Sequence, residues 1–295
     1  MKLIRYGQAG HEKPGMIDKD GMPRDLSGVV DDIAGEVLTR QGLAKLSALE
    51  PSVLPVVPGL PRYGAPVARI GKFICVGLNF TDHAAESGMV VPEQPVIFMK
   101  ATTAIVGAND EVVIPRGGEK TDWEVELGVV IGDTARDVLI SEALAHVAGY
   151  LIVNDLSERA FQLEHGGQWV KGKSCDTFGP IGPWLVTRDE VLDPQNLAMT
   201  LSVNGHRYQN GNSRTMVFGV ARLVSYISRY MTLAPGDVIS TGTPAGVGLG
   251  QRPPVYLRPG DVIDVRIERL GSQRQRVMPA TPNHRQRRDL SPNER

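Results

Sequence analysis

Two glutamates of the segment TDWEVELGVVIG are spaced so that both could bind one ligand. Glu124 and Glu126 are separated by a single residue on a predicted strand, so their side chains leave the same face about 6.5 Å apart. Val125 and Leu127 point to the opposite face and an apolar run follows, which is typical of a buried strand. A Glu-x-Glu pair is most often solvent-facing, but at the mouth of a buried strand one cation could bridge it.

A third carboxylate ends a second apolar strand. The segment GYLIVND places Asp155 directly after its apolar run. Three carboxylates suit a hard ion such as Mg²⁺, Mn²⁺ or Ca²⁺, and they leave coordination positions for water and substrate oxygens. Zinc is disfavoured, because no two histidines have the spacing of a zinc motif and no C-x-x-C occurs in the sequence.

The segment GLNFTDHAAESG predicts a short helix, capped by Thr81 or Asp82, with His83 and Glu86 on one face. A carboxylate that holds one imidazole nitrogen fixes the tautomer and stabilises the imidazolium, as a general base that activates water requires. The alternative is a surface histidine beside a solvated glutamate. Proximity to a metal would favour the catalytic interpretation.

Basic and amide side chains near these acids could bind an anionic ligand. Arg159 and Gln162 lie three residues apart on a predicted helix after the third carboxylate, and Lys173 lies in WVKGKSCDTFGP. Binding of a carboxylate or an oxyanion needs such groups, and Lys100 could help them offset the charge of the acids. Without the acids nearby, each would be interpreted as an ordinary solvated or ion-paired side chain.

Other catalytic motifs are absent from the sequence. There is no G-x-S-x-G segment, and Cys175 has no histidine close to it in the chain. The glycine-rich GTPAGVGLG is followed by QRPPVYL rather than by a helix, and it lacks G-K-[ST], so it fits neither a dinucleotide site nor a P-loop. A water nucleophile and a tight loop beside the substrate are the remaining interpretations.

Composition places these residues in a globular protein. The chain has 295 residues, of which 41% are hydrophobic and 22% charged, and it can bury a full core. Its 32 basic residues nearly balance 33 acidic ones to give a net charge of -1. We therefore expect no nucleic-acid partner, because no overall basic field would attract a phosphate backbone.

Cysteine usage and the N-terminus predict a cytoplasmic protein. The two cysteines, Cys75 and Cys175, are too few for a disulfide framework. The opening MKLIRYGQAG turns polar before an apolar signal segment forms, and no run approaches the roughly 18 apolar residues of a membrane span. We expect neither secretion nor a membrane partner.

A mixed β fold with peripheral helices, of the α+β class, must position the site. The 33 glycines and 21 prolines indicate many turns between short strands. Asn204-Gly205 predicts a tight hairpin and residues 18–21 predict another turn. Hydrophobic spacing predicts strands over residues 2–6, 72–77, 122–132 and 148–155, and helices over 31–49 and 218–231.

Prolines divide the chain. Five of them fall between Pro51 and Pro66, which favours an extended connector. We therefore predict a small N-terminal α+β module with its connector over residues 1–66 and a catalytic domain over 67–278. Residues 279–295 lack apolar periodicity and predict a flexible tail.

Six ordered segments, GLNFTDHAAESG, FMKATTAIVG, TDWEVELGVVIG, GYLIVNDLSERAFQ, GKSCDTFGPIGP and ISTGTPAGVG, resemble the fumarylacetoacetate hydrolase family from about residue 70 to residue 270. The MKLIRYG opening is similar to the small domain of bacterial members that act on sugar-acid or aromatic breakdown products. The resemblance implies a β-roll of two sheets, a homodimer, and a divalent ion held by Glu124, Glu126 and Asp155.

The resemblance also implies roles for single residues. His83 and Glu86 match the catalytic pair and Lys173 matches the oxyanion-binding lysine. Gln162 and Arg159 match substrate-contacting positions, and Thr243 matches a position that contacts the substrate carboxylate. Members of the family differ in whether the histidine serves hydrolysis, decarboxylation, isomerisation or hydration.

The favoured function is hydrolysis of a C–C bond in a 2,4-diketo acid, either an acylpyruvate or a 2,4-diketo-3-deoxy sugar acid such as the L-fuconate derivative. The expected partner is a small anionic 2-oxo or diketo acid. A lyase, isomerase or decarboxylase at the same site is the alternative, of the ureidoglycolate lyase or 2-hydroxyhepta-2,4-diene-1,7-dioate isomerase type. A non-catalytic, metal-stabilised binding protein is a third, which the presence of His83 and Glu86 disfavours.

Overall fold

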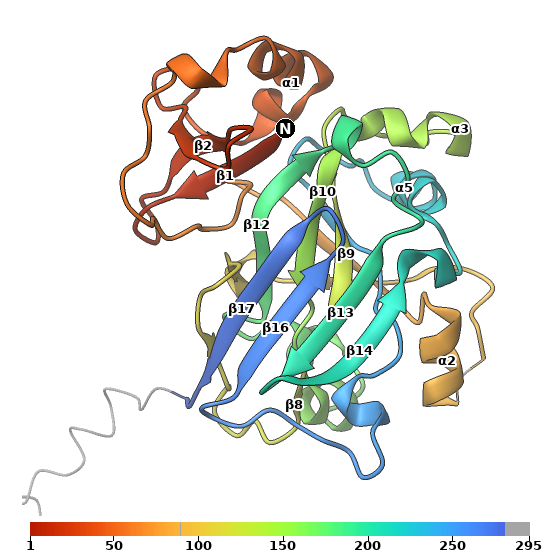
Figure 1. Ribbon diagram of the computed structural model, residues 1–295. Helices are drawn as coiled ribbons and strands as arrows, with labels where there is room; N and C mark the ends of the chain where they lie inside the picture. The colour runs from red at the N-terminus through yellow and green to blue at the C-terminus, as the bar shows by residue number, and fades with distance from the viewer. Residues whose placement is uncertain (89, 281–295) are drawn as a thin grey trace, which may run out of the picture.

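The computed structural model describes residues 1–88 and 90–280, and its strands form a large sheet, a smaller sheet and a short two-stranded ladder (Figure 1). The large sheet contains β1 (Lys2–Tyr6), β2 (Lys13–Ile17), β3 (Pro23–Asp25), β4 (Phe73–Gly77), β5 (Val96–Lys100), β6 (Ile105–Gly107), β9 (Val125–Ile131), β10 (Val147–Asn154), β12 (Gly179–Thr187) and β15 (Val238–Ser240). These strands follow the order β3-β2-β1-β12-β10-β9-β15-β4-β5, with β6 paired to β12.

The smaller sheet contains β7 (Val112–Val113), β13 (Ala198–Val203), β14 (His206–Asn212), β16 (Val262–Ile267) and β17 (Gly271–Met278), in the order β14-β13-β16-β17-β7. The ladder consists of β8 (Thr121–Asp122) and β11 (Ser157–Glu158). Strands β13, β16 and β17 lie against β9, β10 and β12 (Figure 1). The predicted mixed β fold is therefore confirmed.

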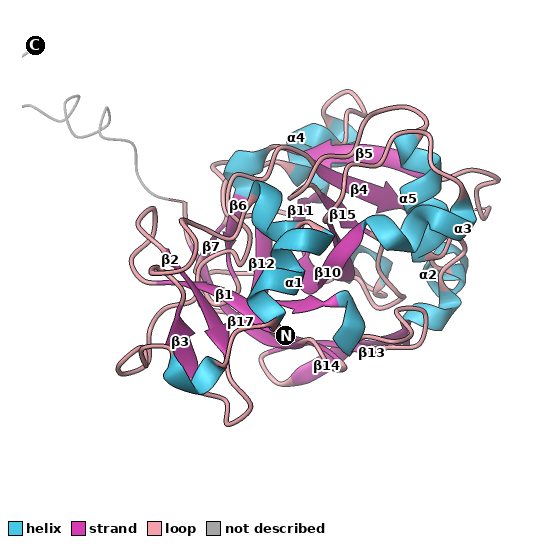
Figure 2. Ribbon diagram, turned by 90° about the horizontal axis from the view of Figure 1, so that it is seen from above, coloured by secondary structure: helices cyan, strands magenta, loops and turns pink. Residues whose placement is uncertain are grey.

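Helices are short and peripheral. The α-helices are α1 (Arg40–Ser47), α2 (Thr81–Ser87), α3 (Ile140–Ala143), α4 (Val170–Lys173) and α5 (Val220–Ser228). A π-helix covers Ala160–Glu164, and 3-10 turns cover Gly35–Leu38, Pro51–Val53, Thr102–Ala104, Leu144–His146, Arg188–Glu190, Ser213–Thr215 and Gly248–Gly250. Helices α2, α3 and α5 gather at one side of the molecule (Figure 2). Within the described ranges, no helix has the length and apolar character needed to cross a membrane.

The main core fills the space between the two sheets. Val125 and Leu127 of β9 pack there with Leu201 of β13 and Val265 of β16, all fully or almost fully buried. Because side chains alternate along a strand, the neighbours Glu124 and Glu126 must leave β9 on its other face. Burial of one face of β9 thus directs its acids to the opposite side.

The N-terminal strands extend the large sheet. β1 pairs antiparallel with β12, so that Lys2 faces Val186 and Leu3 faces Leu185. A second apolar cluster joins Leu3 and Leu38 to Leu151 of β10. The module boundaries at residues 66 and 278 stay a prediction, and residues 281–295 of the predicted tail lie outside the described residues.

Both predicted turns are confirmed. The turn at residues 18–21 joins β2 to β3, and the Asp18 carboxylate accepts the N–H groups of Asp20 and Met22. Asn204 and Gly205 join β13 to β14 with φ values of 52° and 81°. Positive φ at both central residues is the conformation for which Asn-Gly is selected in a two-residue hairpin.

The continuous helix predicted over residues 31–49 is wrong. Thr39 has an extended backbone and its hydroxyl accepts the Gly42 N–H, so α1 begins only after it. Asp32 pairs with Arg5 of β1, with 2.7 Å between Oδ1 and Nε. This long-range ion pair and the local cap outweigh helical spacing. The helix predicted over 218–231 is present as the shorter α5.

A substitution at Gly149 tests the close contact between β10 and β12. A Cβ atom there would lie 2.2 Å from the Val186 carbonyl oxygen, so we expect Gly149→Ala to lower the free energy of unfolding by about 1–3 kcal/mol. Chemical denaturation measures this change. Gly28→Ala is the control, because its Cβ would meet nothing within 4 Å; equal destabilisation by both variants would contradict the prediction.

Candidate active site

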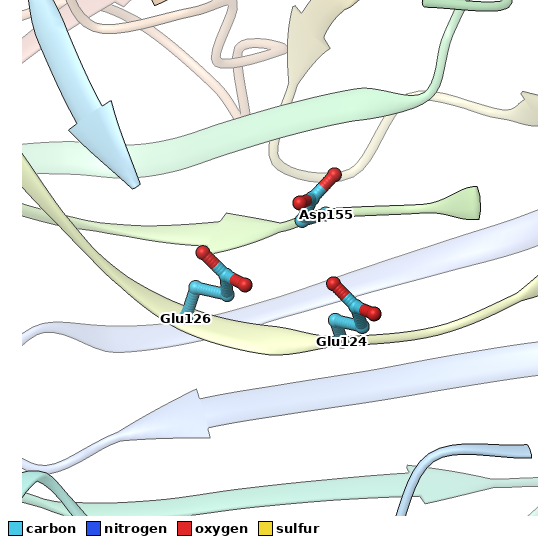
Figure 3. Close-up of side chains that lie close together, drawn as sticks. All are labelled: Glu124, Glu126 and Asp155. Atoms are coloured by element: carbon cyan, nitrogen blue, oxygen red, sulfur yellow. The ribbon is translucent and has the colours of Figure 1, made fainter. Parts of the chain in front are cut away.

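The structure brings the three predicted metal ligands together. One carboxylate oxygen from each of Glu124, Glu126 and Asp155 lies within 4.8 Å of the others, and all three residues are buried. Their carboxylates converge from two neighbouring chain segments (Figure 3). β9 pairs antiparallel with β10, and the Asp155 N–H donates to the Glu124 carbonyl oxygen at 2.9 Å. Glu124 itself lies directly before β9 rather than within it.

Burial and the neighbouring charges act differently on the two glutamates. Burial and the neighbouring carboxylates of Asp155 and Glu124 raise the pKa of Glu126 well above its usual value. Burial also opposes ionisation of Glu124, but the charges of Lys173 and Arg159 outweigh it and lower the pKa of this carboxyl to about 2. A divalent cation among the three oxygens would offset both the burial and the repulsion that raise the pKa of Glu126.

Three buried cations surround the acids. Lys173 Nζ lies 2.7 Å from Glu124 Oε2 and 2.9 Å from Asp155 Oδ2. Arg159 Nη2 lies 2.7 Å from Glu124 Oε1. Lys100 donates to Asp155 Oδ1 and, at 2.9 Å, to the carbonyl of Leu156. Although burial opposes it, the carboxylates raise the pKa of both Lys173 and Arg159 above their usual values, so both stay charged.

His83 and Glu86 form the predicted pair on α2. His83 Nδ1 lies 3.3 Å from Glu86 Oε2, and both side chains are half-buried. The other Glu86 oxygen accepts the Gly246 N–H at 2.9 Å. Glu86 is thereby held by two hydrogen bonds. Its contact with His83 uses Nδ1, so the other imidazole nitrogen of His83, Nε2, is available for another partner.

The predicted cap of this helix is wrong. The residue before α2 is Phe80, whose backbone is extended and which makes no side-chain cap. Thr81 is already helical, and the Asp82 carboxylate accepts the N–H of its neighbour His83 at 3.0 Å. The tertiary position of Phe80, fully buried in the main core, sets the start of the helix instead.

A cavity of about 360 Å³ joins these groups. Its walls include eight of the predicted site residues: His83, Glu86, Glu124, Glu126, Arg159, Gln162, Lys173 and Thr243. Asp155 and Lys100 lie behind this lining. The Thr243 hydroxyl donates to the Val125 carbonyl at 2.8 Å and accepts from Gln209 at 2.7 Å, so it also ties its loop to β9.

Sequence reasoning missed Asp122. This buried carboxylate accepts the N–H groups of Gly248 at 2.6 Å and Leu249 at 2.9 Å, and Arg159 Nε at 2.8 Å. It therefore links the arginine to the glycine-rich loop that forms another wall of the cavity. The sequence contains a signal for this residue. Asp122 and Glu124 are two residues apart, so they share a face of an extended chain.

Buried acids that can hold a divalent cation, next to a cavity sized for a small ligand, define a class of metal-dependent enzymes that act on small molecules. Within that class the chain belongs to the fumarylacetoacetate hydrolase family. The family model described as fumarylacetoacetate hydrolase C-terminal matches residues 72–278. The resemblance drawn from the six ordered segments is confirmed.

Similar proteins cover nearly the whole chain. A provisionally named hydrolase of Burkholderia multivorans is 63% identical over 276 residues, which are 93% of this chain and 98% of that protein. A solved fumarylacetoacetate hydrolase of Exiguobacterium antarcticum is 38% identical with a TM-score of 0.83, and the match covers 95% of this chain and 100% of that chain.

Two further solved structures carry different activities in their names. Maleylpyruvate hydrolase of Sphingobium sp. SYK-6, in complex with manganese(II) and pyruvate, is 28% identical with a TM-score of 0.80, covering 95% of this chain and all of that chain (100%). The 2-hydroxyhepta-2,4-diene-1,7-dioate isomerase of Mycobacterium marinum is 31% identical with a TM-score of 0.72, covering 96% and 100%. Each name describes the activity of that solved protein.

A substitution at Asp122 tests whether this carboxylate holds the glycine-rich loop. Asp122→Asn places an amide group among N–H donors, so we expect faster hydrogen exchange over residues 246–250 and a lower melting temperature. Asp237→Asn is the matched control, because Asp237 also accepts two backbone N–H groups while buried elsewhere. It should lower the melting temperature without changing exchange over residues 246–250, and equal exchange in both variants would contradict the assignment.

Proposed function

We propose that this protein is a divalent-metal-dependent hydrolase that cleaves a C–C bond of a 2,4-diketo acid to give pyruvate and a carboxylic acid. One observation carries the proposal: the His83–Glu86 pair lines the same cavity as Glu124 and Glu126. A base that can activate water and acids that can hold a cation thus face one small ligand space.

The acids fit a hard cation by their chemistry. Three carboxylate oxygens within 4.8 Å of one another suit Mg²⁺ or Mn²⁺, and Ca²⁺ accepts the same ligand type. Burial and the Asp155 and Glu124 carboxylates raise the pKa of Glu126, and the charge of Lys173 offsets this only in part. When bound, such an ion would polarise substrate oxygens and stabilise negative charge that develops on them. The manganese and pyruvate in the Sphingobium neighbour support this assignment.

The chain's own residues supply binding and proton transfer. We assign the substrate carboxylate to Arg159, with Thr243 and Gln162 in the same cavity wall. His83, held through Nδ1 by Glu86, takes a proton from water through Nε2, and the resulting hydroxide attacks the 4-oxo carbon. Lys173 stabilises the oxyanion that forms there, and Gln162 assists it. Lys100 contributes from behind by holding Asp155.

The cleavage step needs no reactant other than water. The C3–C4 bond breaks, its electron pair goes to C3, and the acyl half leaves as a carboxylic acid. The imidazolium of His83 returns the proton to the pyruvate enolate, so water is the sole co-substrate. The predicted homodimer and cytoplasmic location remain predictions that accompany this proposal.

A same-site isomerase, decarboxylase or lyase is the second candidate. The solved isomerase of Mycobacterium marinum favours it, because a protein 31% identical carries that name. Such a reaction would use the same metal ligands but would need no attacking water. The His83–Glu86 pair favours hydrolysis.

Product analysis tests the proposal. With Mg²⁺ or Mn²⁺ and an acylpyruvate in ¹⁸O-labelled water, we expect pyruvate and a carboxylic acid that carries one ¹⁸O atom. Excess EDTA should abolish turnover, and Glu126→Ala should lose calorimetric Mn²⁺ binding while the exposed control Glu142→Ala retains it. Turnover by protein confirmed to be metal-free, or rearrangement without incorporation of the label, would reject the hydrolase assignment.

His83→Ala tests the general base. We expect a loss of roughly a hundredfold or more in kcat with unchanged Mn²⁺ affinity, as when a positioned base is removed. Glu86→Gln should lose less, since orientation of the imidazole partly survives. The exposed His11 provides the control variant His11→Ala. Retention of the parental rate by His83→Ala would show that another group activates water.

A further inference from the structure

The cavity changes character from its buried end to its mouth. Its buried end holds the acids, Lys173 and Arg159, whereas much of the remaining lining consists of large apolar side chains. We call these apolar lining residues the apolar wall, which consists of Phe98, Leu163, Trp169, Val247 and Leu249. The wall begins beside the cations, because Lys173 Nζ lies 5.2 Å from the centre of the Phe98 ring. Leu163 and Leu249 are 48% and 39% exposed. Large apolar side chains left exposed at the mouth of a cavity indicate a surface that a ligand covers.

The aromatic part of the wall is preformed. The rings of Phe98 and Trp169 pack edge to face, with centroids 5.4 Å apart. A Cβ atom on Gly77 would lie 2.6 Å from a Trp169 ring carbon. The indole thus occupies space that any side chain at position 77 would need, and β4 and β5 together hold it at the cavity.

The glycine-rich loop offers few free N–H donors to the cavity. The N–H groups of Gly246, Gly248, Leu249, Gly250 and Gln251 all donate to protein oxygens. The Gln251 side chain also donates to the Val247 carbonyl at 3.1 Å. A hydroxyl oxygen placed against this loop would give up its water and find these five N–H donors already used.

Charge is also sparse at the mouth. Among the charged residues that line the cavity, Arg252 is the exposed one, and the others belong to the catalytic and metal-ligand groups already assigned. A carboxylate paired with a solvated arginine gains little, because water screens the attraction. Arg252 therefore provides a weak site for a second substrate anion.

We infer that the distal acyl group of the substrate is apolar, aromatic or branched aliphatic, rather than a polyhydroxylated chain or a second carboxylate. The inference rests on the proposed function and names the substrate class of that site. The diketo-acid end meets the cations at the buried end, and the acyl group R of R–CO–CH₂–CO–COO⁻ covers the apolar wall. A cavity of about 360 Å³ is at the lower end for small ligands, so R is compact.

Three 2,4-diketo acids with different distal groups test the inference. Benzoylpyruvate, fumarylpyruvate and a 2,4-diketo-3-deoxy sugar acid are compared with the full-length, Mg²⁺-loaded protein. We expect kcat/KM for benzoylpyruvate to exceed the other two by at least about tenfold, the smallest discrimination typical of an apolar pocket. A preference for either polar substrate would overturn this inference and leave the proposed function intact. Cleavage of none of the three would overturn both.

Variants locate the preference in the wall. Leu163→Asn and Leu249→Asn should each raise KM for benzoylpyruvate by roughly tenfold and narrow its advantage over the sugar acid, with little change in kcat. Leu192→Asn is the control, because Leu192 is 89% exposed and lies outside the cavity lining. Melting temperatures confirm that each variant is folded. An unchanged preference in both wall variants would overturn the inference.

The variant Arg252→Ala distinguishes an apolar distal group from a second carboxylate. An apolar distal group predicts unchanged kcat/KM for benzoylpyruvate in this variant. A loss of tenfold or more for fumarylpyruvate, together with fumarylpyruvate as the preferred substrate of the parent protein, would assign the mouth to a second carboxylate and overturn the inference.

Discussion

Three carboxylates gathered in a protein interior need positive charge close to them, and the arrangement of this site follows from that constraint. Burial disfavours the charged form of a carboxyl group. Lys173 spans Glu124 and Asp155, Arg159 reaches Glu124, and Lys100 holds Asp155 from behind. Glu126 has no such partner among the described residues; its Oε2 accepts from Ser240 and from the Gly242 N–H. The position with least compensation is where a bound cation would contribute most.

The packing of the two sheets allows these charged side chains to lie close together. One face of β9 is closed by the main core, so Glu124 and Glu126 face the cavity on the other side. Antiparallel pairing with β10 then places the third acid beside the first. The proposed catalytic pair comes from a separate short helix, and it lines the cavity with Glu86 anchored to the loop at Gly246. Strands hold the acids, while shorter segments carry the groups to which we assign contact with a ligand.

Local patterns predicted much of the fold because their causes are local. Alternation of side chains directed the acids of β9, and the positive φ values of Asn204 and Gly205 follow from the two residue types in that turn. The helix predicted from residue 31 failed for a nonlocal reason. Asp32 pairs with Arg5 of β1, which is 27 positions earlier in the chain. Helical spacing of apolar residues cannot register such a partner.

The sequence by itself determined which chemistry was available: the two glutamates on one face, an acid at a strand end, and a histidine one helical turn from a glutamate. These features depend on spacings of two or three residues, which backbone geometry converts directly into proximity. Only the tertiary structure decided that Lys100 lies behind the cavity, that Asp122 holds the loop, and that Trp169 packs on Gly77. Those contacts join distant segments, as between Gly248 and Asp122, 126 positions apart, because sheet register and core packing, rather than local spacing, set their distances.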